Sequence, residues 1–170
     1  MEEHQQLLIQ ARQLTVQLEE AYIRLRRHTE EMAEYRQEAK KGLAGLLQGI
    51  FPMPQPMEPE HQRFFENVQE LTEQLAQVLA SMPADEERQG LAHRAVACIL
   101  APKPLENKNP EEWFMTAADG LSVSLLPYLS RADLEQFRAD LLANTPKRYM
   151  FPKQREVLSK MDELLAGQPS

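Results

Sequence analysis

The chain has 170 residues, a formal net charge of −7 at pH 7, and an aromatic content of 6%. Its length suffices for one domain with a sizeable core, or for a small domain that carries a helical arm. The acidic balance argues weakly against nucleic-acid binding, and the lone Cys98 excludes an intramolecular disulfide. No run of 18 apolar residues is present, so we expect no membrane span and a cytoplasmic protein.

The first fifty residues carry apolar side chains at alternating steps of four and three, which is typical of a coiled-coil or bundle helix. The spacing predicts one helix from about Glu2 to Gly49. We expect the chain to self-associate as a homodimer along this seam, whose members are Leu7, Ala11, Leu14, Leu18, Ala21, Leu25, His28, Met32 and Tyr35, continued by Ala39, Gly42 and Leu46.

A second apolar row lies on another face of the same helix, at Ile9, Val16 and Ile23. Two apolar faces predict that the first half of the helix is covered on both sides, as in a three- or four-helix assembly. From Arg24 onward the helix is polar apart from its seam. This second half is expected to project or to pair more thinly.

Four prolines fall between Phe51 and Pro59, a spacing that rules out a helix and favours an extended linker. We therefore divide the chain into a long helix at 1–50, a proline-rich linker at 51–59, and a compact helical domain at 60–170 that packs against the first helix.

The remaining helices are marked by helical apolar spacing and by capping residues or prolines at their starts. They are expected at about Pro59–Met82, Ala84–Ala101, Pro110–Pro127 with a break near Gly120, Ser130–Ala143 and Pro152–Gly167. No alternating β-branched run predicts a strand. The fold class is therefore all-α: a bundle with a long amino-terminal helix and about five shorter ones.

Catalytic and metal-binding patterns are weak. Glu58 and His61 have the spacing of a carboxylate-histidine pair in a di-iron bundle, but such a site needs that pair twice. His28 lies on the seam, where it could set the register or titrate near neutral pH. Cys98 lies in an apolar run, which favours an inert thiol. We expect no enzyme, no cofactor and no metal.

One basic and aromatic segment stands out near the carboxyl end. It contains Lys147, Arg148, Tyr149, Lys153 and Arg155, without an acid between them. Bases and aromatic rings together are typical of a contact with phosphate or single-stranded nucleic acid. The same segment would also serve as a loop between helices, with Tyr149 and Phe151 covering the core.

The leading hypothesis is a non-enzymatic protein-protein interaction protein, such as a helical adaptor, chaperone-like protein or assembly factor. The alternative is a nucleic-acid-associated accessory subunit that uses residues 147–155. The third and weakest hypothesis is an enzyme with a metal site formed by carboxylates inside a helical bundle.

Overall fold

The computed structural model describes residues 2–43, 59–101 and 110–168, all of them in helices or short connections. Six α-helices are present in these ranges: α1 (Glu2–Leu43), α2 (Pro59–Ser81), α3 (Glu86–Ile99), α4 (Pro110–Asp119), α5 (Arg131–Asn144) and α6 (Pro152–Gly167). Short 3-10 helices follow α4 and precede α6: η1 (Gly120–Ser124), η2 (Leu126–Tyr128) and η3 (Lys147–Tyr149). The predicted all-α class is confirmed.

The starts of the shorter helices agree with their capping residues. Asp85 accepts a hydrogen bond from the backbone N–H of Arg88 at 3.0 Å, and Ser130 accepts one from Asp133 at 3.1 Å. Each side chain satisfies an N–H group that has no partner within its helix. Pro59, Pro110 and Pro152 occupy first helical positions, where a missing N–H costs nothing.

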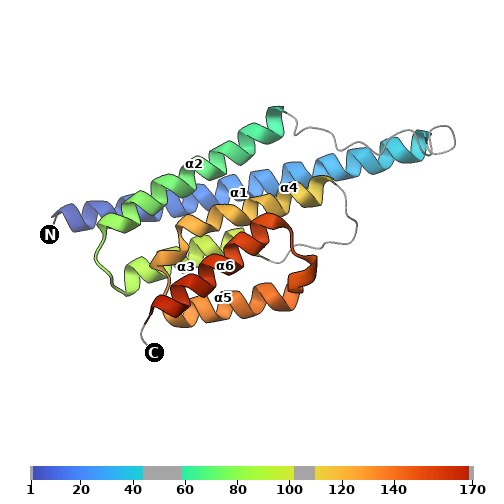
Figure 1. Cartoon of the computed structure of the whole chain (residues 1–170). Coiled ribbons are helices and arrows are strands. Elements are labelled where there is room, and N and C mark those ends of the chain that lie inside the picture. The colour runs from blue at the N-terminus through green and yellow to red at the C-terminus, as the bar shows by residue number, and fades with distance from the viewer. Residues whose placement is uncertain (1, 44–58, 102–109, 169–170) are drawn as a thin grey trace.

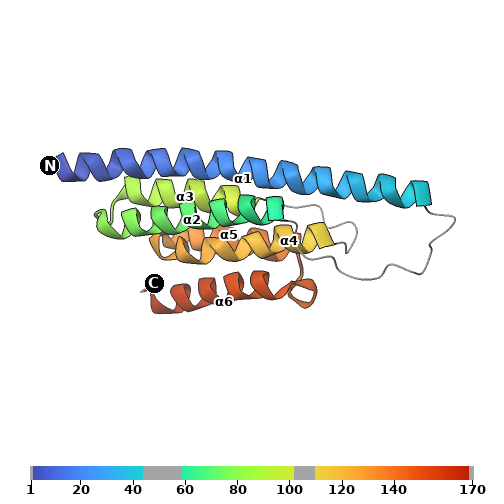
Figure 2. The same cartoon turned by 90° about the horizontal axis from the view of Figure 1, so that it is seen from above.

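α2 runs antiparallel to α1 (Figure 1), and α1 lies along one side of the molecule (Figure 2). α2, α3 and α4 all contact α1, and α6 lies on the opposite side of the bundle (Figure 2). The carboxyl end of α1 extends past the other helices in both views. The carboxyl end of α1 thus projects as expected, whereas Leu25 and Thr29, in the first turns of its second half, are still buried in the bundle.

The core is formed by one cluster of buried apolar residues from all six helices. Three of the buried threonines each donate their hydroxyl to a backbone carbonyl one turn earlier in the same helix: Thr15 to Ala11, Thr29 to Leu25 and Thr72 to Val68. The hydroxyl is thereby satisfied without a partner from another helix.

The long helix was predicted to reach Gly49, whereas α1 ends at Leu43; residues 44–58, including the proline-rich segment from Phe51, lie outside the described residues. None of the helices that the structure describes combines the length and apolar composition needed to cross a membrane.

Candidate interaction surface

The outer face of α1 carries a row of exposed aliphatic side chains. Ile9 is 54% exposed, Val16 41% and Ile23 53%. The seven-residue spacing keeps them on one face, and none of the described helices lies beyond α1 on that side of the molecule (Figure 2). We call Ile9, Val16 and Ile23 the outer row. The sequence predicted that this row is covered, but none of the residues that the structure describes covers it.

The predicted self-association seam lies on the inner side of α1. Ala11, Leu14, Leu18, Ala21 and Leu25 are buried in the core of the chain itself. Leu7, His28 and Met32 are half-buried, and Tyr35 is 75% exposed at the projecting end. The surroundings of Ala39 and Gly42, and Leu46 as a whole, lie outside the described part. A second copy cannot reach the buried members while this fold is kept. Self-association stays a prediction, and the outer row is the apolar part of α1 that it could use.

Charged side chains flank the outer row. Arg12, Glu20 and Arg27 are exposed. Glu19, by contrast, is held within the chain, because Nη2 of Arg94 on α3 lies 2.6 Å from its Oε1 and Nε lies 3.0 Å from its Oε2. This two-pronged pair links α3 to α1 at the surface and raises the pKa of Arg94. Arg12 and Glu20 therefore remain the charges beside Val16 that a partner can meet.

His28 and His61 form a pair between α1 and the start of α2. Their Nδ1 atoms lie 3.0 Å apart, so the N–H of one ring donates a hydrogen bond to the bare nitrogen of the other. His61 is fully buried, and its burial, together with the nearby His28, lowers the pKa of His61 to about 4. Nε2 of His28 lies 3.7 Å from a carboxylate oxygen of Glu60. Because the pKa of His61 is low, its ring is uncharged at neutral pH, and its contact with His28 joins the two helices.

Both histidines had been singled out in the sequence, but for other reasons. His28 was expected to set register, and His61 was considered with Glu58, which lies outside the described residues. Their contact spans 33 positions, so no local spacing could have predicted it.

A buried polar group joins α4 to α6. Nε2 of Gln154 donates to Oδ2 of Asp119 at 3.1 Å, and both residues are buried. Tyr22 is also buried; burial and the charge of Asp119 raise the pKa of its hydroxyl, which donates to the carbonyl of Ile99 at 3.2 Å. The sequence reading missed Asp119. Asp119 could have been found from its position four residues after the buried Met115, because this spacing places both residues on the inner face of α4.

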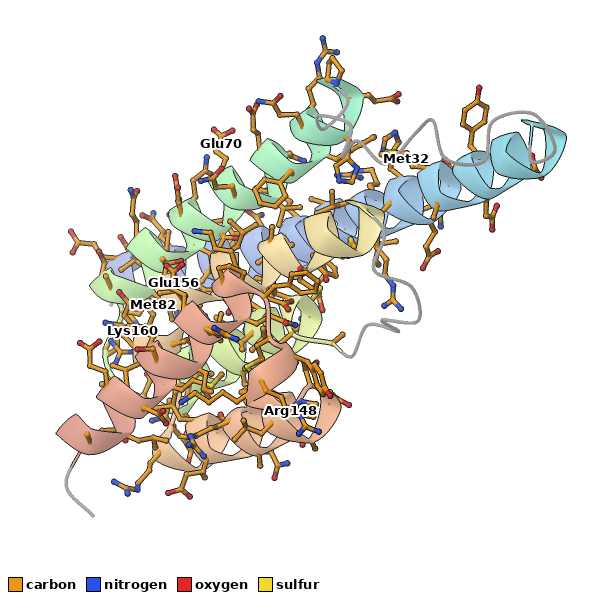
Figure 3. The ribbon with its side chains drawn as sticks, turned by 45° about the vertical axis from the view of Figure 1, so that its right-hand side comes forward. Met32, Glu70, Met82, Arg148, Glu156 and Lys160 are labelled. Atoms are coloured by element: carbon orange, nitrogen blue, oxygen red, sulfur yellow. The ribbon has the colours of Figure 1, made fainter. Side chains whose placement is uncertain are left out.

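The basic segment is exposed at its charged residues. Lys147, Arg148, Lys153 and Arg155 are all exposed, and Tyr149 is 61% exposed, with the guanidinium of Arg148 4.7 Å from its ring centre. Figure 3 shows Arg148 at the surface of the connection between α5 and α6. Met150, rather than Tyr149, is the buried anchor of this connection. The expectation that Tyr149 covers the core is therefore wrong.

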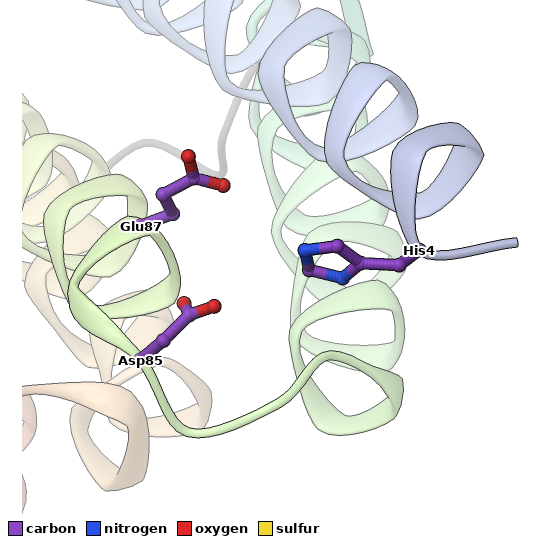
Figure 4. Close-up of side chains that lie close together, drawn as sticks. All are labelled: His4, Asp85 and Glu87. Atoms are coloured by element: carbon purple, nitrogen blue, oxygen red, sulfur yellow. The ribbon is translucent and has the colours of Figure 1, made fainter. Parts of the chain in front are cut away.

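A cluster of one histidine and two carboxylates lies where the start of α1 meets the start of α3. His4, Asp85 and Glu87 offer ligand atoms that all lie within 4.8 Å of one another (Figure 4). Nδ1 of His4 is buried without a hydrogen-bond partner in the described structure. One carboxylate already caps α3, however, and Glu87 is exposed. We assign no function to this cluster.

A hollow of about 390 Å³ lies between α3 and α5, lined by Ala97, Leu100, Ala101, Phe137, Asp140, Leu141 and Asn144. Its lining contains a single carboxylate, without a histidine, cysteine or hydroxyl beside it. Cys98 is half-buried on α3 and is absent from this lining.

Fold and surface together define the class of the protein: an all-α helical bundle with an apolar row on the outer face of its longest helix. Comparison of the chain with models of protein families, with curated proteins and with solved structures gave no match.

Proposed function

We propose that the protein is a non-enzymatic interaction protein that self-associates through the outer face of α1. The observation that carries this proposal is the outer row: three aliphatic side chains, 41–54% exposed, at seven-residue spacing on a long helix. An exposed row of regularly spaced aliphatic residues on an otherwise polar helix face is more typical of a protein-binding site than of ordinary protein surface. A cytoplasmic location belongs to the same proposal, because one thiol is compatible with a reducing compartment.

The energetics favour a weak, concentration-dependent complex. Complete burial of an Ile or Val side chain contributes about 1.5–3 kcal/mol, so the exposed parts of three such side chains offer about 3 kcal/mol per copy and about 6 kcal/mol per pair. Association costs about 4–15 kcal/mol in lost translational and rotational freedom. The row alone therefore does not hold two copies together tightly, so polar contacts beside the row must supply the remainder and association should be seen only at high protein concentration.

Light scattering tests the proposal by measuring the absolute mass of the full chain over a hundredfold range of concentration. We expect a rise from 19.6 kDa toward a dimer. The variant Ile9→Gln/Val16→Gln/Ile23→Gln should stay monomeric, since Gln keeps the helix and removes the aliphatic contact. Tyr149→Gln, which removes an exposed aromatic residue elsewhere, is the control and should associate like the wild type. A wild-type chain that stays monomeric throughout would refute self-association.

A second candidate function, contact with single-stranded nucleic acid, is favoured by the exposed Tyr149 with Arg148 over its ring. Base stacking on such a ring, with phosphates held by nearby Lys and Arg, is how single strands are bound without sequence preference. Binding should weaken steeply with salt as counterions are released. Replacing Lys147, Arg148, Lys153 and Arg155 by Glu should abolish it, whereas Arg63→Glu on α2 should not. Unchanged binding by the fourfold variant would rule this function out.

A further inference from the structure

We propose that the outer row is covered by a second copy of this chain, in an antiparallel pair whose twofold axis passes beside Val16. This inference rests on the proposed self-association and adds the orientation and the register of the two helices. The observations that carry it are the symmetric positions of the apolar and the charged residues about Val16.

The apolar positions are symmetric. Ile9 and Ile23 lie seven residues before and seven residues after Val16, on the same exposed face. When two copies pair antiparallel about Val16, this residue meets its own copy, and Ile9 of each chain meets Ile23 of the other. The six aliphatic side chains then meet in three pairs, spaced about 10 Å apart along the helix axis. A twofold pair of this kind uses the same patch on both copies and closes on itself.

The charges select the antiparallel orientation. Arg12 and Glu20 lie four residues before and four residues after Val16, and both are exposed. Antiparallel pairing sets Arg12 of each copy opposite Glu20 of the other, which gives two attractive pairs. Parallel pairing in register sets Arg12 opposite Arg12 and Glu20 opposite Glu20. Opposed like charges discriminate strongly against that arrangement, and a staggered parallel arrangement does not close into a dimer.

The surroundings of the row permit this arrangement. α1 forms one side of the molecule, so the remaining helices of the two copies lie on opposite sides of the helix pair (Figure 2). Arg27 falls opposite Gln5 of the second copy, one turn from its Glu2. Glu30, which falls opposite Glu2, is already paired within its own chain with Arg26 at 3.4 Å.

Disulfide trapping tests the orientation in the full chain, with Cys98→Ala as the background. Val16→Cys should give a dimer on a non-reducing gel. Ile9→Cys alone and Ile23→Cys alone should not, whereas a mixture of the two should. Ala139→Cys, at an exposed position on α5, is the control for random collision. A dimer of Ile9→Cys alone, or of Ile23→Cys alone, would show a parallel pair and overturn the inference while self-association stands.

Charge exchange provides a second, independent measurement. Arg12→Glu and Glu20→Arg should each weaken dimerisation by about tenfold, because each turns two attractions into two repulsions. The double variant should recover the wild-type affinity. Single variants that leave the affinity unchanged, or a double variant that is weaker than either, would overturn the antiparallel register. If no cysteine variant is trapped and the wild type is a monomer by light scattering, the proposed function itself fails.

Discussion

The inner and outer faces of α1 carry apolar residues of similar hydrophobicity in different surroundings. Leu18 and Ala21 on the inner face are buried among the other helices, whereas Ile9 and Ile23 on the outer face are more than half exposed. Small residues at Ala11 and Ala21 allow the neighbouring helices to approach closely on the inner side. The comparison teaches that seven-residue spacing identifies a face of a helix but does not tell which molecule covers it.

The largest effect should come from a cavity in the inner face. Leu18→Ala should lower the free energy of unfolding by about 3–4 kcal/mol, because the side chain is fully buried and its removal leaves a void. Ile23→Ala, on the outer face, should change it by less than about 0.5 kcal/mol in the monomer. Urea denaturation at a concentration where the chain is monomeric measures both. Equal losses would mean that the two faces are not distinct.

Acid should weaken the inner contact where α1 meets α2. The pKa of His61 falls from 6.5 to about 4 on folding, so the unfolded chain binds the proton first as the pH is lowered. The stability contributed by neutral His61 is thus complete above pH 6.5 and is lost as the pH falls toward 4, by on the order of 2–3 kcal/mol. The facing groups are His28 and Glu60.

The measurement is the free energy of unfolding at pH 7 and at pH 5 for the wild type and for His61→Gln. The variant should show a smaller loss between the two pH values. His93→Gln, which alters an exposed histidine that lies 3.2 Å from Asp133, controls for general titration. A variant that loses as much stability as the wild type would show that His61 does not govern this window.

Much of the fold followed from local signals in the sequence. Pro59, Pro110 and Pro152 begin helices as expected, and Ser130 caps α5 through the N–H of Asp133. These signals work because the first turn of a helix has its own hydrogen-bonding needs, which are met by neighbours in the chain. The helical spacing of the apolar residues then predicted which face of each helix is buried, as for Leu18 in α1.

The candidate site was harder to predict, because it depends on which faces remain uncovered. The spacing of Ile9, Val16 and Ile23 is the same whether another helix of the chain lies over them or not. The His28–His61 contact likewise joins residues from separate helices. Tyr149 was expected in the core, but the neighbouring Met150 is buried there instead. Adjacent side chains in a short connection point in different directions, and the sequence does not tell which of the two faces the core.

A moderate effect is expected from the polar group in the core. Gln154→Ala should lower the free energy of unfolding by about 1–3 kcal/mol, because Asp119 loses a buried donor. The backbone N–H of Phe151 also loses its acceptor, the Oε1 atom of Gln154 at 3.2 Å. Arg155→Ala, at the adjacent exposed position, should change stability little. Thermal denaturation compares the two, and similar midpoints would show that the buried bond contributes nothing net.

The smallest effect is expected where the inner and outer faces of α1 meet, at the Glu19–Arg94 pair. Although two short contacts join them, both side chains are partly solvated, so a double-mutant cycle with Glu19→Gln and Arg94→Gln should give a coupling of less than about 1 kcal/mol. The coupling should shrink further at high salt, because solvent screens exposed charges. Glu19→Gln should also leave dimerisation unchanged, since this carboxylate is engaged within its own chain. A loss of dimer on Glu19→Gln would place the axis elsewhere along α1 than beside Val16.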